Sequence, residues 1–135
     1  MSRFTKPAFA TEIAISERAN VKILVFSSLA YSLVNFRGAL LNSIREAGHD
    51  VLAVAPDNDS FVSDWLADHN IGFKTVAMNR TGMKPMQDLQ TLLGYIRLIA
   101  QEKPDLILAY TQKPIIYGGI AARLAGNVPF YALMS

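Results

Sequence analysis

The sequence predicts an α/β protein built around a doubly wound parallel sheet. Short, almost continuously apolar runs such as VKILVF (21–26) are typical of strands that helices bury on both faces. Segments with apolar residues at helical spacing separate these runs, so strands and helices alternate along the chain. Because right-handed crossovers join parallel strands, we expect the strand order 3-2-1-4-5, with ligands at the carboxyl ends of the strands.

The first strand–helix–strand unit covers residues 21–56. Val21–Phe26 is the first strand, and a polar turn, Ser27–Arg37, follows it. The next helix ends at Gly48, because glycine favours the left-handed conformation that closes a helix. Val51–Ala55 is the second strand. The expected apolar face of the helix consists of Phe36, Leu40, Ile44 and Ala47.

The middle of the chain repeats this pattern. A short helix over 60–70 leads to a third strand over 73–78, and its expected packed side contains Phe61, Trp65 and Leu66. A polar turn over 79–85 precedes a long helix that runs to about residue 103. The expected packed face of that helix consists of Met86, Leu89, Leu93, Ile96 and Ala100.

The last unit contains a fourth strand (106–110), a turn (111–114), a helix (116–124) closed by Gly126–Asn127, and a fifth strand (130–134). The fifth strand has no covering helix after it. We therefore expect the first part of a longer protein, with residues 1–20 as an N-terminal extension and 21–135 as one domain. We also expect self-association, or an apolar patch, near 131–134.

The composition excludes several classes of protein. The chain has no cysteine, so disulfides, zinc–thiolate sites and thiol nucleophiles are excluded. The net charge of +2 is too small to indicate nucleic-acid binding, and no apolar run approaches the ~20 residues of a membrane span. The hydrophobic content of 51% with only 18% charged residues indicates either a rich core or a face that a second domain, a partner or a membrane surface covers.

Basic residues gather in the turns at the carboxyl edge of the predicted sheet. Arg37 follows strand 1, Arg80 and Lys84 follow strand 3, and Lys113 follows strand 4. Such a group of cations suits a phosphate or diphosphate. The alternative is that exposed turns carry charges without binding anything.

Other polar residues are weaker candidates. Ser27 and Ser28 are either ligand hydroxyls or ordinary turn residues, and Tyr110 is either a ligand contact or a core residue. His49 and His69 fall on the opposite, amino edge, where we expect surface or helix-end positions. The stretch 21–37 contains no glycine, so dinucleotide and P-loop sites are not expected. We expect no cofactor and no metal site.

Several short motifs, in their order and spacing, resemble the amino-terminal domain of a glycosyltransferase family 4 enzyme with the GT-B fold. The resemblance is greatest to the subgroup that assembles surface polysaccharides, and it covers about residues 21–135. The motifs are NFRG (35–38), EAGHDV (46–51), NRTG (79–82), KPDLI (103–107), KP (113–114), IYG (116–118) and AARLAG (121–126).

The resemblance implies a Rossmann-like acceptor-binding domain of a two-domain, retaining glycosyltransferase. A second domain, which this chain lacks, would bind the nucleotide-sugar donor, so the 135 residues alone are expected to be inactive. The implied acceptor is a glycan on a lipid diphosphate, and the implied location is cytoplasmic or peripheral on the inner face of the plasma membrane. No catalytic residue is identified. The turns and the motifs together give these candidate acceptor-binding residues: Ser27, Asn35, Arg37, Gly38, Arg80, Thr81, Thr111, Gln112 and Lys113.

The chain departs from the family pattern at two turns, and two other functions remain open. It has Ser27-Ser28-Leu29 where members often have glycines, and Gln112 where many have a histidine. One alternative function is a non-enzymatic binding or interaction domain of the same fold. The other is half of a GT-B nucleotide-sugar epimerase, which would need catalytic acids in these turns, where the sequence has few.

Overall fold

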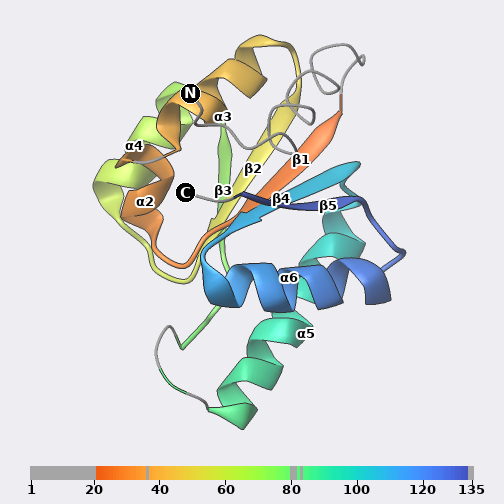
Figure 1. The fold of residues 1–135 in the computed structure, drawn as a ribbon. Helices are drawn as coiled ribbons and strands as arrows, with labels where there is room; N and C mark the ends of the chain where they lie inside the picture. The colour runs from red at the N-terminus through yellow and green to blue at the C-terminus, as the bar shows by residue number, and fades with distance from the viewer. Residues whose placement is uncertain (1–20, 36, 80–81, 83, 134–135) are drawn as a thin grey trace.

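The computed structural model describes residues 21–135 except 36, 80, 81, 83, 134 and 135 (Figure 1). Strands and helices alternate as the sequence predicts. The elements are β1 (Lys22–Phe26), α2 (Ala30–Asn35), α3 (Gly38–Glu46), β2 (Asp50–Ala55), α4 (Ser60–Asp68), β3 (Gly72–Thr75), α5 (Pro85–Glu102), β4 (Leu106–Tyr110), α6 (Gln112–Leu124) and β5 (Phe130–Leu133). The predicted extension over residues 1–20 lies outside the described residues.

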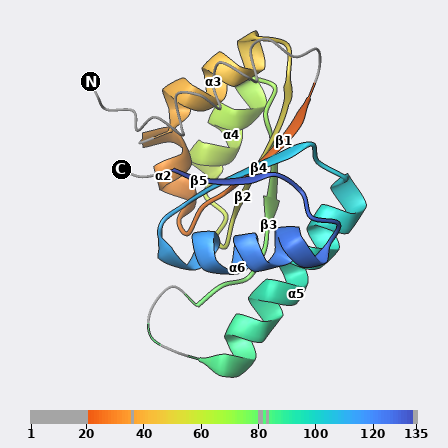
Figure 2. The same ribbon diagram turned by 45° about the vertical axis from the view of Figure 1, so that its right-hand side comes forward.

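The five strands form one parallel sheet in the order β3-β2-β1-β4-β5, which confirms the predicted topology. Helices α2, α3 and α4 cover one face of the sheet, and α5 and α6 cover the other (Figures 1 and 2). The strand order reverses between β1 and β4. The turns after these two strands therefore form the place where a doubly wound sheet binds its ligands.

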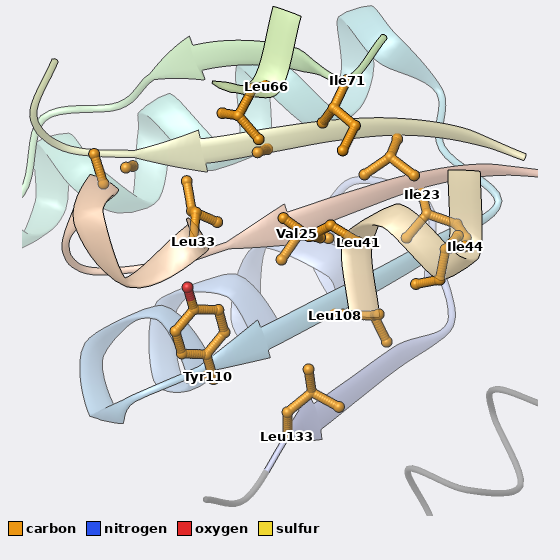
Figure 3. Packing of buried hydrophobic residues seen from close by; sticks show 14 of the residues in the cluster. Ile23, Val25, Leu33, Leu41, Ile44, Leu66, Ile71, Leu108, Tyr110 and Leu133 are labelled. Carbon is orange, nitrogen blue, oxygen red and sulfur yellow. The ribbon is translucent and has the colours of Figure 1, made fainter. Parts of the chain in front are cut away.

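Each face of the sheet has its own hydrophobic core, because successive strand residues point to opposite sides. Ile23 and Val25 of β1 face helices α2 to α4, where Figure 3 shows them among the leucines and isoleucines of that layer. Leu24 and Phe26 face α5 and α6. The ring of Phe26 stacks on Tyr95 of α5 with centroids 4.1 Å apart, so the second core is anchored on β1 as well.

The turn after β1 contains a short helix, α2, which the sequence analysis did not predict. The Asp57 carboxylate accepts a hydrogen bond of 2.8 Å from the N–H of Ala30 and so caps the start of α2. This cap comes from the turn after β2, 27 residues later, and leaves no local sequence pattern. The following helix, α3, starts after Arg37, and Gly48 with φ of 97° follows its end, as predicted.

Two predicted packing faces are wrong. On α5, Met86, Leu89, Leu93 and Ala100 are exposed, and the buried side carries Asp88, Thr91, Tyr95, Leu98 and Ile99. The polar members of this side are satisfied by partners elsewhere in the fold: Thr91, for example, donates a hydrogen bond of 2.7 Å to the carbonyl of Ala77. On α4, Phe61 is exposed while Val62 and Leu66 are buried.

The predicted surface position of His49 is also wrong. Its side chain is fully buried at the amino edge of the sheet, and Nδ1 accepts a hydrogen bond of 3.1 Å from the N–H of Val21. His69 follows the end of α4, as predicted, and stacks on Trp65. At the β5 edge Tyr131 is exposed and Leu133 is buried, so only part of the predicted apolar patch is present among the described residues.

Candidate functional site

The turns after β1 and β4 are joined by hydroxyl groups at the carboxyl edge of the sheet. Thr111 Oγ1 donates a hydrogen bond of 3.0 Å to Ser28 Oγ. Ser27 lies deeper and is fully buried, and its hydroxyl donates to the carbonyl of Val54 on β2 at 2.9 Å. Ser27 therefore fixes the turn to the sheet, whereas Ser28 and Thr111 are the hydroxyls near solvent.

Thr111 has an unusual backbone conformation. Its φ of 67° and ψ of 163° lie in a region that is populated almost only by glycine. Holding a non-glycine residue there costs about 1–3 kcal/mol, and such outliers cluster at binding sites. This conformation turns the chain directly from β4 into α6, so α6 begins at Gln112, four residues earlier than the sequence indicated.

Lys113, one of the predicted phosphate ligands, is already paired. Its Nζ lies 2.9 Å from Asp88 Oδ1 on α5 and also donates to the carbonyl of Asn79. The Tyr117 hydroxyl donates to the other Asp88 oxygen at 3.1 Å. The hydrogen bond from Lys113 holds the pKa of Asp88 below its ordinary value, whereas burial and the neighbouring Asp88 carboxylate raise the pKa of Tyr117.

These groups line a cavity of about 370 Å³ at the carboxyl end of β4. Its lining comes from the turns after β1 and β4, the segment before α5, and helices α5 and α6. The lining residues are Ser28, Gly82, Asp88, Thr111, Gln112, Lys113, Ile116 and Tyr117. The cavity offers hydroxyl, amide and carboxylate groups at a volume suited to a sugar-sized ligand.

Arg37 lies on the other side of the sheet from Lys113. Its guanidinium stands over the ring of Tyr110, 4.9 Å from the centroid, and its Nε atom is buried with no hydrogen-bond partner within the described part of the chain. The Tyr110 hydroxyl bonds Ser32 Oγ at 2.9 Å, and its ring belongs to the core beneath α2 (Figure 3). Burial raises the pKa of Tyr110 above its ordinary value.

The remaining predicted site residues differ in their exposure. Asn35 and Gln112 are exposed at the same edge, whereas Gly38 is buried against Trp65, where an added Cβ would lie 3.3 Å from the indole. Gly38 thus allows close packing of α3 against Trp65. Arg80 and Thr81 lie outside the described residues.

No sequence motif marks Asp88 and Tyr117 as site residues. The only available pattern was an acid in the first turn of a helix, which is ordinary there because it favours the helix dipole. Asp57 and Asp59, the acids in the turn after β2, cap the starts of α2 and α4. Within the described residues no cluster of three or more acids and histidines is arranged to hold a metal ion.

The comparisons with known proteins agree with the fold. The family model described as "Glycosyl transferase 4-like" matches residues 22–135. The chain therefore belongs to that family, and its fold is that of the amino-terminal, Rossmann-like domain of GT-B glycosyltransferases. No curated protein sequence matches the chain significantly.

Solved structures with this fold include transferases and an epimerase. MurG of Acinetobacter baumannii matches with a TM-score of 0.65 and 21% identity, over 83% of this chain and 33% of its own. A glycosyltransferase from Rickettsia africae has a TM-score of 0.60 and 16% identity, over 86% of this chain and 29% of its own. A Listeria monocytogenes protein described as a UDP-N-acetylglucosamine 2-epimerase has a TM-score of 0.61 and 13% identity, over 85% of this chain and 31% of its own. The chain thus spans about a third of the length of these proteins.

Proposed function

We propose that this chain is the acceptor-binding half of a retaining glycosyltransferase of surface-polysaccharide assembly. In this proposal a nucleotide sugar held by a second domain donates its sugar to a glycan on a lipid diphosphate. The protein acts in the cytoplasm, peripherally on the inner face of the plasma membrane. Family membership and the cavity at the strand-order reversal support this assignment.

The observation that carries the proposal is the Arg37 guanidinium, whose buried Nε has no hydrogen-bond partner among the described residues. Lys113 has its charge balanced by Asp88, so it acts mainly to join α5 to α6. The guanidinium of Arg37 contacts the ring of Tyr110, and no residue in the described part of the chain accepts a hydrogen bond from its Nε. We therefore assign the acceptor phosphate to Arg37 and its sugar to the cavity beside Ser28 and Thr111. Each charge-assisted hydrogen bond to a phosphate contributes about 1.5–3 kcal/mol.

A binding experiment on the 135-residue chain tests this assignment without requiring turnover. We expect a soluble, diphosphate-linked monosaccharide to bind in isothermal titration calorimetry. Arg37→Gln should weaken binding about tenfold or more, since one charge-assisted contact is lost. Arg97→Gln is the matched control, because Arg97 lies exposed on α5. Equal affinity of the wild type and the Arg37 variant would refute the phosphate assignment.

A nucleotide-sugar epimerase is the second candidate, favoured by the structural match to the Listeria protein. It would need acids at this edge. Asp57 and Asp59 are occupied as helix caps, and Asp88 is held by Lys113 and Tyr117. The acids therefore favour the transferase. Tight binding of a nucleotide sugar to this chain, with no binding of the diphosphate-linked sugar, would favour the epimerase instead.

A further inference from the structure

Within the described part of the chain, two charged side chains line the cavity at the carboxyl end of β4, and their charges are opposite. Asp88 of α5 and Lys113 of α6 form the ion pair of 2.9 Å, and their side chains are only 10% and 16% exposed. Helices α5 and α6 lie side by side on one face of the sheet, and the pair lies where they meet (Figure 2). The described lining of the cavity therefore carries no net charge.

The hydrogen bonds of this pair leave Asp88 with spare acceptor capacity. Among the described residues, Lys113 donates to Asp88 Oδ1 and to the carbonyl of Asn79, which uses two of its three ammonium protons. The other Asp88 oxygen accepts from the Tyr117 hydroxyl. An ionised carboxyl group can accept about four hydrogen bonds. Asp88 can therefore accept further bonds from the hydroxyl groups of a ligand in the cavity.

The rest of the described lining is uncharged. The Ser28 hydroxyl accepts a hydrogen bond from Thr111 and can donate its own proton to a ligand. Gln112 is exposed and adds an amide that both donates and accepts. Ile116 and Tyr117 supply apolar surface. A ligand rich in hydroxyl groups and without charge finds suitable partners in this lining.

We propose that the cavity selects an uncharged sugar, a hexose or an N-acetylated hexosamine, and that Asp88 excludes sugars that carry a carboxylate. This inference rests on the proposed function and specifies the class of its acceptor sugar. A sugar hydroxyl donates to Asp88, whereas a sugar carboxylate places a like charge beside it and offers no donor. Lys113 does not offset this repulsion, because Asp88 already balances its charge.

Two probes that differ at one carbon atom test the selectivity. They are short-chain alkyl diphosphates of glucose and of glucuronic acid, in which a carboxylate replaces the hydroxymethyl group. Isothermal titration calorimetry with the 135-residue chain, near neutral pH, gives both affinities. We expect the glucose probe to bind more tightly by about tenfold or more, because like charges in contact are strongly disfavoured. Equal affinities, or tighter binding of the glucuronic acid probe, would overturn the inference.

Two variants of the ion pair should move this preference in opposite directions. Asp88→Asn removes the negative charge and leaves the Lys113 ammonium uncompensated, so the preference for the glucose probe should disappear. Lys113→Gln leaves the Asp88 carboxylate uncompensated, so the preference should increase about threefold or more. Asp64→Asn is the matched control, because Asp64 is an exposed acid on α4, which covers the other face of the sheet. It should keep the wild-type preference.

The ratio of the two affinities is insensitive to partial unfolding of a variant. An unfolded fraction lowers the concentration of competent sites for both probes alike. Circular dichroism establishes that each variant is folded, and an unfolded Asp88→Asn protein leaves Lys113→Gln to decide. An unchanged ratio in the folded variants, or a shift of both ratios in the same direction, would overturn the role of Asp88.

Arg37→Gln separates this inference from the phosphate assignment. Arg37 lies on the other side of the sheet, so its variant should weaken both probes by the same factor and leave their ratio unchanged. Equal wild-type affinities, with both lowered in Arg37→Gln, would reject the sugar selectivity and keep the phosphate site. A preference for glucose that Arg37→Gln leaves at full affinity would keep the selectivity and reject the phosphate site. Binding of neither probe to the wild type would overturn both.

Discussion

Asp88 on α5 and Lys113 on α6 form an ion pair of 2.9 Å that joins the two helices beneath the candidate acceptor cavity. The pair also links two turns of the carboxyl edge, because Lys113 donates to the carbonyl of Asn79 in the segment before α5. Lys113 therefore shapes the cavity wall by holding α5, α6 and this segment together.

We expect Asp88→Asn to destabilise the fold and to alter its dependence on pH. The lowered pKa of Asp88 means that its contribution is fully present above the ordinary value of 3.8. The contribution is lost as the pH falls through the lower pKa of the folded state. Urea unfolding of the wild type and the variant as a function of pH measures this difference. Asp64→Asn, an exposed acid on α4, is the control; an equal pH dependence for Asp88→Asn and the wild type would contradict the role of the pair.

Thr111 provides a test of backbone strain. Glycine accepts φ of 67° with ψ of 163° without strain, whereas alanine keeps the strain and loses the hydroxyl. We expect Thr111→Gly to be more stable than Thr111→Ala by about 1 kcal/mol or more in chemical denaturation. At Gln112, the first residue of α6, the order should reverse, because alanine favours a helix. A Thr111→Ala protein that is as stable as Thr111→Gly, or more stable, would show that Thr111 stores no strain.

Gly118 lets α6 approach the sheet closely. An added Cβ would lie 2.7 Å from Phe26 Cδ2 and 3.1 Å from the ring of Phe130, so Gly118→Ala should lower the free energy of unfolding by about 1–3 kcal/mol. Gly119→Ala is the neighbouring control. Its Cβ would meet Phe130 at 3.3 Å, and the gain in helix propensity of about 1 kcal/mol offsets that tighter contact. A Gly118→Ala protein as stable as the wild type would mean that α6 can move away from β1 at little cost.

His49 serves the fold at the amino edge. His49→Leu removes the acceptor of the Val21 N–H in a fully buried position, which should cost about 1–3 kcal/mol. His49→Asn offers an amide oxygen in a similar place and should recover part of that loss. Thermal unfolding gives the stability, and hydrogen exchange of the Val21 amide reports the bond itself. Unchanged Val21 protection in the leucine variant would be inconsistent with this bond.

The sheet could be predicted from the sequence, whereas much of the helical packing could not. The run LILAY gave β4 its observed bounds, because a strand buried on both faces is continuously apolar. On α5, however, Leu89 and Leu93 follow the same spacing as a core stripe, and the true buried side includes Asp88 and Thr91. Those two are buried because partners on α6 and in the segment after β3 satisfy them, which periodicity does not record.

The candidate site, too, could be predicted only in part from the sequence. Its edge was predictable, since the carboxyl ends of parallel strands and the order reversal follow from topology. The pairing of Lys113 with a residue 25 positions away and the placement of Arg37 on the opposite side depend on tertiary contacts. Counting cations in turns could therefore locate the edge but could not show that Lys113 pairs with Asp88 while Arg37 lies over Tyr110.

Helix α5 is attached at both of its ends. Asp88 holds its first turn to α6, while Glu102 in its last turn accepts hydrogen bonds from Lys22 and Lys74 at 2.7 and 2.9 Å, and these bonds lower the pKa of Glu102. The exposed residues of α5 between Asp88 and Glu102 take no part in these ion pairs. Helix α5 is thus held in place at its two ends, and substitutions on its exposed side would leave these contacts intact. The same fold can therefore gain or lose a binding face on α5 while the carboxyl edge of the sheet keeps its position.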